Sequence, residues 1–190
     1  MRFCLSTMKG YPLRFNLFLA LAILLLPFFG CQSMEKDLGM KKDEPTAAMR
    51  VHIELPPENA GEINVSQTIS LMRADPVQVS IDKDAILTEA NLLAAKLINT
   101  PAAPAVEVRF EDKGAWILEQ YSAANPGRHF VIYGQWGTNL NDGRWIAAPL
   151  ISHRIKDGVM SFTPDMSKKE VDDFVKGLNN AIKQDQTGSN

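Results

Sequence analysis

The chain has 190 residues, of which 45% are hydrophobic and 22% are charged, and its formal net charge at pH 7 is −2. This mildly acidic balance argues against a partner such as nucleic acid, which calls for a basic surface. The chain contains two cysteines, too few for the disulfide framework of small secreted domains.

Residues 1–30 have the pattern of an export signal. Arg2, Lys9 and Arg14 make the start basic, no acid occurs among these residues, and an apolar run from Leu17 to Phe29 follows. The run is shorter than the roughly 20 residues that a membrane-spanning helix needs. We therefore interpret residues 1–30 as a signal peptide that is removed on export.

The end of this signal, Leu26-Pro27-Phe28-Phe29-Gly30-Cys31, resembles the lipobox of bacterial lipoproteins. The resemblance implies cleavage before Cys31 and a lipid anchor on this residue, although Phe28 and Phe29 depart from the usual leucine and small residue. Without the signal, 17 basic residues face 22 acidic ones, a net charge of −5. Gln32, in place of an aspartate, favours the outer membrane, with the protein facing the periplasm. The alternative is an ordinary signal with a chance cysteine behind it.

The remaining chain divides into a tether, one domain and a tail. Residues 31–48 are polar, mixed in charge and without apolar periodicity, so we expect a flexible, lipid-anchored tether. Residues 184–190 form a matching disordered tail. Residues 49–183 between them have the usual size of a single domain with one core.

Alternation of apolar and polar residues predicts three strands at the start of this domain. Pro56-Pro57 and Asp75-Pro76 separate them. The apolar positions are Val51, Ile53 and Leu55, then Ile63, Val65, Ile69 and Leu71, then Val77, Val79 and Ile81.

A helix, a strand and a second helix are expected next. Thr88 precedes an alanine- and leucine-rich run to Ile98, typical of a largely buried helix that ends before Pro101. Residues 106–110 alternate as a strand, and Asp112 is a candidate cap for a helix through Tyr121. A strand over residues 128–135 follows.

Two Asp-Gly pairs indicate hairpins, because Asp-Gly readily adopts the positive φ angles of a type I′ turn. Asp142-Gly143 introduces a strand over 144–151, and Asp157-Gly158 joins residues 152–155 to 159–163. In the last helix, Ser167 and Glu170 form a capping box ahead of an apolar stripe that is expected to pack on the sheet. The stripe consists of Val171, Phe174, Val175, Leu178 and Ile182.

The sequence shows no pattern of catalytic or metal-binding residues, so we predict no enzymatic activity, cofactor or metal. His52, His129 and His153 are scattered singly, and we expect His52 and His153 to face solvent from strands. Glycine loops that bind phosphates and nucleophile elbows are absent. Glu107 and Glu111 share a strand face, but an exposed strand of alternating charge has the same pattern.

The one feature with binding potential is an aromatic set around residues 135–144. Trp136, Trp145 and Tyr133 are candidates for an interface, where tryptophan is often an anchor. The competing interpretation is that Trp145 opens a strand and packs in the core.

Short motifs from Val106 to Ile182 resemble the periplasmic head subdomain of the SecD subunit of the bacterial preprotein translocase. The main one is the segment from Asp142 to Ile151, which is similar to the family's D-G-x-x-x-S-A-P-x-I strand with Ala147 in place of the serine. The others are the segment from Phe110 to Ala115, Asn125-Pro126-Gly127-Arg128, Ile155-Lys156-Asp157-Gly158, Phe162-Thr163 and Gly177-Leu178-Asn179-Asn180.

The resemblance implies an α+β fold: a ferredoxin-like antiparallel sheet with helices packed on one face, here preceded by additional N-terminal strands. It also implies contact with exported polypeptides or envelope proteins. We therefore expect a non-catalytic, lipid-anchored envelope protein that binds polypeptides or a partner, with a link to protein export. The alternatives are a structural or assembly lipoprotein of the outer membrane and, less favoured, an unrecognised hydrolase.

Overall fold

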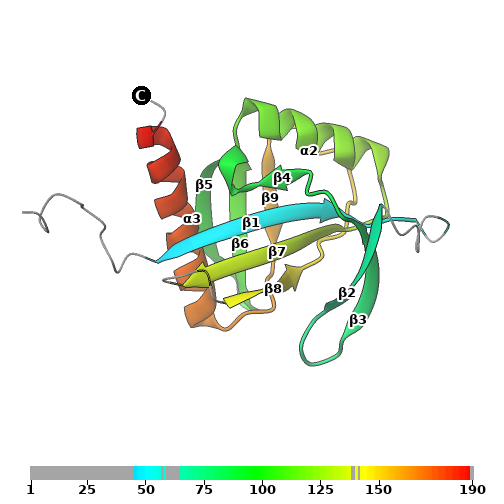
Figure 1. The fold of residues 1–190 in the computed structure, drawn as a ribbon, viewed down its shortest axis with the longest axis horizontal. Helices are drawn as coiled ribbons and strands as arrows, with labels where there is room; N and C mark the ends of the chain where they lie inside the picture. The colour runs from blue at the N-terminus through cyan, green and yellow to red at the C-terminus, as the bar shows by residue number, and fades with distance from the viewer. Residues whose placement is uncertain (1–44, 57, 59–64, 138–139, 141, 189–190) are drawn as a thin grey trace, which may run out of the picture. The chain divides into compact units, whose positions relative to one another are not determined.

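A computed structural model describes residues 45–56, 58, 65–137, 140 and 142–188. Cys31, the predicted signal and most of the predicted tether lie outside these ranges. The elements, labelled as in Figure 1, are β1 (Thr46–Ile53), β2 (Ser66–Leu71), β3 (Val77–Asp82), β4 (Leu87–Thr88), the 3₁₀ helix η1 (Glu89–Asn91), β5 (Leu92–Asn99), β6 (Pro104–Phe110), α2 (Asp112–Ala124), β7 (Phe130–Gly137), β8 (Asp142–Ala147), β9 (Val159–Phe162) and α3 (Lys168–Gly188).

All the described strand pairs are antiparallel. They form a four-stranded sheet in the order β4-β1-β7-β8, a three-stranded sheet in the order β5-β6-β9 and the β2–β3 hairpin. The predicted α+β class with antiparallel sheets is therefore confirmed, as are the strands near the N-terminus. The strands are divided among three sheets, whereas the sequence suggested one principal sheet.

The four-stranded and three-stranded sheets lie one in front of the other (Figure 1) and share one hydrophobic core. Val51 on β1 and Ile132 on β7 contribute from one sheet, and Val106 and Val108 on β6 contribute from the other, each fully buried. The helix α3 contacts β1, β5 and β7, so it links both sheets, while α2 contacts β6 and β4.

The helix α3 confirms the predicted capping box and apolar stripe. The Ser167 N–H donates to Glu170 Oε2 at 2.7 Å, and the Glu170 N–H donates to Ser167 Oγ at 3.3 Å. Every residue of the predicted stripe is buried. At Gly177 the helix approaches β1 so closely that a Cβ atom would lie 2.6 Å from the carbonyl carbon of Thr46. Only glycine allows this contact without displacing backbone.

The prediction of a helix over residues 88–98 is wrong. After the short helix η1, the chain extends as β5 and pairs with β6 from Leu92 to Asn99. The side-chain amide of Asn179 on α3 bonds the backbone of Ala95, accepting from its N–H at 3.2 Å and donating to its carbonyl oxygen at 2.8 Å. Pairing on both sides satisfies the strand, so these long-range contacts override the helical preference of alanine and leucine.

The two Asp-Gly pairs have different outcomes. The hairpin of β7 and β8 exists, but Asp142 and Gly143 lie within β8, opposite Trp136 and Gln135. Gly158 is in a turn with φ +66°, yet residues 152–155 form no strand, and β9 pairs with β6 instead. The strand β8 ends at Ala147, earlier than the predicted end at residue 151.

The described elements also extend past two predicted domain boundaries. The strand β1 begins at Thr46, inside the predicted tether, and Ala47 is already buried. The helix α3 continues to Gly188, inside the predicted tail. In the described ranges, no helix combines the length and the apolar character needed to cross a bilayer.

The β2–β3 hairpin covers the face of the four-stranded sheet that points away from the main core. Ile69 and Leu71 on β2 and Ile81 on β3 are buried there against Val131 of β7, and Trp145 packs beside them. This second, smaller core explains why neighbouring residues of β7 are all buried: Val131 faces the hairpin and Ile132 faces the main core.

Candidate functional site

The four-stranded sheet separates one of the three aromatic residues predicted to form a set, Trp136, from the other two, Trp145 and Tyr133. Trp136 belongs to the main core, where it packs edge-on against Phe174 with ring centroids 6.1 Å apart. Trp145 packs against the β2–β3 hairpin and makes an edge contact with Tyr133 at 5.2 Å. Trp136, one of the predicted interface candidates, is therefore a core residue and is only 3% exposed.

The three histidines lie on different elements and do not converge. His52 is buried, not solvent-facing, because the β2–β3 hairpin and Trp145 cover its side of β1. Its Nδ1 hydrogen-bonds the carbonyl oxygen of Asp82 at 2.9 Å, which only partly opposes the effect of burial, so the pKa of His52 is lowered. His129 pairs with Glu54 at 2.6 Å, and His153 is exposed in a loop.

The described residues offer no cluster of metal-binding side chains. No group of three His, Cys, Asp or Glu side chains among them is close enough to hold a metal ion. Glu107 and Glu111, which share a strand face in the sequence pattern, have separate neighbours: Glu107 pairs with Ser161 and Lys96 across the sheet, and Glu111 accepts a hydrogen bond from Asn91.

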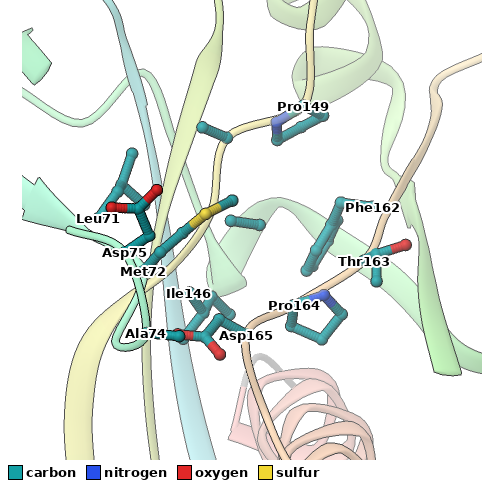
Figure 2. Close-up of a pocket in the computed structure, with 12 residues that line it drawn as sticks. Leu71, Met72, Ala74, Asp75, Ile146, Pro149, Phe162, Thr163, Pro164 and Asp165 are labelled. Atoms are coloured by element: carbon teal, nitrogen blue, oxygen red, sulfur yellow. The ribbon is translucent and has the colours of Figure 1, made fainter. Parts of the chain in front are cut away.

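An apolar groove of about 520 Å³ lies beside the β2–β3 hairpin (Figure 2). Three separate segments form its walls: residues 71–75 from the hairpin, residues 146–149 from the end of β8, and residues 162–165 from the end of β9 toward α3. The lining residues are Leu71, Met72, Ala74, Asp75, Ile146, Ala147, Ala148, Pro149, Phe162, Thr163, Pro164 and Asp165.

Met72 is the most unusual residue of this groove. Its side chain is 58% exposed and extends into the space between the walls (Figure 2). Its backbone has φ +64°, a conformation that costs a residue with a Cβ atom about 1 kcal/mol. An exposed, flexible thioether on a strained turn is typical of surfaces that adapt to varied apolar partners.

A charged cluster links the walls of the groove at the end where Asp165 lies. The Arg73 N–H donates to Asp165 Oδ2 at 2.9 Å, and Arg73 Nε lies 3.6 Å from the same oxygen. Arg144 donates to Glu170 Oε1 at 3.1 Å and to the carbonyl oxygen of Asp165 at 3.0 Å. These bonds attach the hairpin turn to the start of α3 and to β8.

Glu170 is held ionised within this cluster. Burial acts to raise its pKa, but hydrogen bonds from Ser167 and Arg144 outweigh that effect and lower the pKa from 4.5 to about 2. The guanidinium of Arg144 also lies over the ring of Trp136, 4.7 Å from its centroid. The cluster therefore joins the groove to the main core.

Sequence reasoning missed the groove. Its walls come from three separate segments, of which residues 71–75 are distant in the sequence from the other two, and each segment alone looks like a turn or a strand end. Two of its motifs, Ala147-Ala148-Pro149 and Phe162-Thr163, appear in the resemblance described above, where they indicated fold. The two motifs themselves were the signal available in the sequence, but only the structure places them on facing walls of one groove.

Comparison with known proteins gives a consistent family. The model of the family described as "SecDF, P1 head subdomain" matches residues 66–181. One similar solved structure is described as a membrane component SecDF that enhances protein export, with 20% identity, a TM-score of 0.48, and coverage of 80% of this chain and 70% of that one. Another is SecDF in a super-membrane-facing form, with 19% identity, a TM-score of 0.48, and coverage of 70% of this chain and 18% of that one. No curated protein matches the chain in sequence.

Proposed function

Because the family model matches well over half of it, the chain belongs to the SecDF P1 head subdomain family, and we propose that it is a non-catalytic polypeptide-binding module of the bacterial envelope with a part in protein export. We include in this proposal the lipid anchor on Cys31, and with it attachment to the outer membrane facing the periplasm. The anchor would hold the domain at a membrane surface that faces the periplasm, the compartment that exported chains enter.

The observation that carries the proposal is the apolar groove beside the β2–β3 hairpin. Unfolded polypeptides expose apolar side chains that folded proteins bury, so an open apolar groove is a natural receptor for them. The groove supplies Leu71, Ala148 and Phe162 as apolar surface and Met72 as an adaptable contact. Trp136, one of the predicted anchors, has no part in it because it lies in the core.

The direct test is binding of a permanently unfolded protein, such as reduced and carboxymethylated α-lactalbumin, to the purified full chain. Met72→Asn removes the apolar side chain, and asparagine tolerates the positive φ of this turn, so the fold is expected to remain intact. We expect the affinity to fall about fivefold to tenfold, the effect of losing one well-placed apolar contact.

Trp116→Asn is the matched control, since Trp116 is a large apolar residue on α2 that is 62% exposed and does not line the groove. It should leave the affinity unchanged. A chain that does not bind unfolded protein but binds one folded envelope protein would instead support the structural or assembly alternative.

The anchor has a separate test. Mass spectrometry of the mature chain from a bacterial host should show cleavage before Cys31 and an added acyl mass on that residue. A Cys31→Ser variant should lose the acyl mass and leave the membrane fraction. A water-soluble product that retains residues 1–30 would contradict the anchor and leave the groove proposal standing.

A further inference from the structure

We propose that the groove receives an extended polypeptide segment as an added β-strand between β9 and the chain that follows β8, and that it prefers segments with a basic residue. This inference rests on the proposed function and specifies how the polypeptide is recognised. The hydrogen-bonding pattern of the two strand edges that face the groove supports strand addition.

The first edge is the outer edge of β9. The Phe110 N–H donates to the carbonyl oxygen of Gly158, and the same register pairs Val108 with Met160. Backbone groups alternate in direction along a strand, so those of Ser161 and Thr163 point away from β6. In the described ranges these groups form no hydrogen bond with backbone or side chains.

The second edge is the segment after β8. The Phe130 N–H donates to the carbonyl oxygen of Pro149, and the Ile151 N–H donates to that of Arg128, which turns these two residues of the segment toward β7. By the same alternation, the backbone groups of Ala148 and Leu150 point away from β7, and they too have no hydrogen-bond partner among the residues described.

Among the residues described, a single backbone hydrogen bond joins the two edges. The Asp165 N–H donates to the carbonyl oxygen of Ile146 at 2.7 Å. Continuing this antiparallel register would place Ala148 opposite Thr163 and Leu150 opposite Ser161, but no hydrogen bond joins either pair in the described structure. The edges are therefore in register but separated.

Two hollows occupy the gap between these edges. The groove lies between residues 146–149 and residues 162–165, and a second hollow of about 320 Å³ lies between residues 149–153 and residues 159–161. Pro149 lines both of them. Along the chain after β8 the groove comes first and the second hollow follows it, so the two hollows lie one after the other along the gap.

An extended polypeptide satisfies this geometry better than a small molecule. A strand in the gap can bond Ser161 and Thr163 on one side and Ala148 and Leu150 on the other, and alternate side chains would enter the apolar hollows. Main-chain bonding does not depend on sequence, which suits a receptor for diverse unfolded chains.

The charge of the groove adds a preference. The carboxylate of Asp165 is bonded to Arg73, whereas that of Asp75, at the hairpin side of the groove, has no ion pair or hydrogen bond to any other described residue. Figure 2 shows the Asp75 side chain beside Leu71 at the edge of the groove. A lysine or arginine next to the apolar part of the bound segment would pair with it.

The first experiment removes a main-chain donor from the gap. Ser161→Pro deletes an N–H that points away from β6, so the β6 ladder keeps its bonds, as proline on an edge strand allows. We expect about tenfold weaker binding of unfolded protein, with an unchanged circular dichroism spectrum. Ser161→Val keeps the N–H and should bind as the wild type does. Equal affinity for a folded Ser161→Pro variant would overturn strand addition.

A second measurement uses the unchanged chain, in case Ser161→Pro does not fold. A peptide of alternating valine and serine around one lysine is compared with the same peptide N-methylated at two central residues, which keeps every side chain. Strand addition predicts at least tenfold weaker binding of the methylated peptide. Equal binding of the two peptides would refute strand addition and leave the proposed function intact. If the chain binds neither the peptides nor the unfolded protein, both strand addition and the proposed function are refuted.

The basic preference is tested with Asp75→Asn. The wild type should bind the lysine peptide about threefold to fivefold more tightly than a peptide with glutamine in its place, the usual strength of a partly exposed ion pair. The variant should bind both peptides equally. A preference that persists in the variant, or that is missing in the wild type, would refute the role of Asp75.

Discussion

The two flanks of the domain, where the four-stranded and three-stranded sheets approach each other, are closed by different means. On one flank α3 bridges β1 and β5: Gly177 contacts the backbone of Thr46, and Asn179 bonds Ala95. On the other flank β8 and β9 share the bond from Asp165 to Ile146 and then separate around the groove. One flank is closed by direct packing and the other opens into the groove, so substitutions should lower stability at the first flank and weaken the proposed polypeptide binding at the second.

The largest expected effect is at the closed flank. Phe174→Ala removes a fully buried ring that packs against Trp136 and lies under Gly134. Loss of such a side chain costs about 3–5 kcal/mol of the free energy of unfolding, because a cavity remains. Urea denaturation should show the midpoint shift. A loss below about 1 kcal/mol would mean that α3 contributes little to the closed flank.

Gly177→Ala tests the close approach of α3 to β1. The added methyl would lie 2.6–2.8 Å from Thr46 and Ala47, mostly from backbone atoms, so the helix must move. Although alanine is the better helix former, we expect a net loss of about 1–3 kcal/mol in thermal or urea unfolding. Stabilisation by this change would show that the flank can relax.

Asn179→Ala tests the side-chain amide that bonds the edge of β5. It removes two hydrogen bonds to Ala95 and one to the carbonyl oxygen of Val175, and it leaves the N–H and carbonyl of Ala95 without their partner, at a cost of about 1–3 kcal/mol. Asn180→Ala is a neighbouring comparison, since Asn180 donates one bond, to the carbonyl oxygen of Pro45, and the cost should be smaller. Equal losses would mean that the edge of β5 does not depend on the paired amide.

Glu170 lies in the first turn of α3, and its lowered pKa predicts that the stability of the fold depends on pH. Its pKa is about 2 in the folded protein and 4.5 as an ordinary carboxyl, so its stabilisation is present in full above pH 4.5 and is lost as the pH falls toward 2. With allowance for solvent screening, the contribution is about 2 kcal/mol.

The measurement is urea unfolding of the wild type and Glu170→Gln between pH 2 and pH 7. The variant should be less stable at pH 7, and the difference should shrink below pH 4.5. Because the pKa of His52 is also lowered, both proteins should share a further loss of stability that begins as the pH falls below about 6.5. A constant difference across this range would contradict the assigned role of Glu170.

The smallest effect on stability is expected at the open flank. Met72→Gly relieves the positive φ of the hairpin turn, and Met72 has little buried surface to lose. The free energy of unfolding should therefore change by less than about 1 kcal/mol, and the expected change is an increase. Binding of unfolded protein should nevertheless weaken. A large loss of stability would show that the open flank is part of the core after all.

Local patterns were sufficient for much of the fold. Alternation located β1, β2, β3 and β6, and the Ser167–Glu170 capping box with its apolar stripe located α3. These predictions succeeded because strand alternation and helix capping involve residues close together in the chain. The resemblance to the SecD head was likewise carried by short motifs, and the family match confirms it.

Contacts between residues far apart in the chain determined the remaining features of the fold. Residues 92–99 became a strand because β6 and Asn179 supply its hydrogen bonds, and His52 became buried because the β2–β3 hairpin covers its face of β1. The groove exists only where residues near positions 72, 148 and 163 come together. Short stretches of sequence were enough for the local elements and the family, whereas long-range pairing and burial set the faces of the sheets and the groove, since no short stretch of chain contains those contacts.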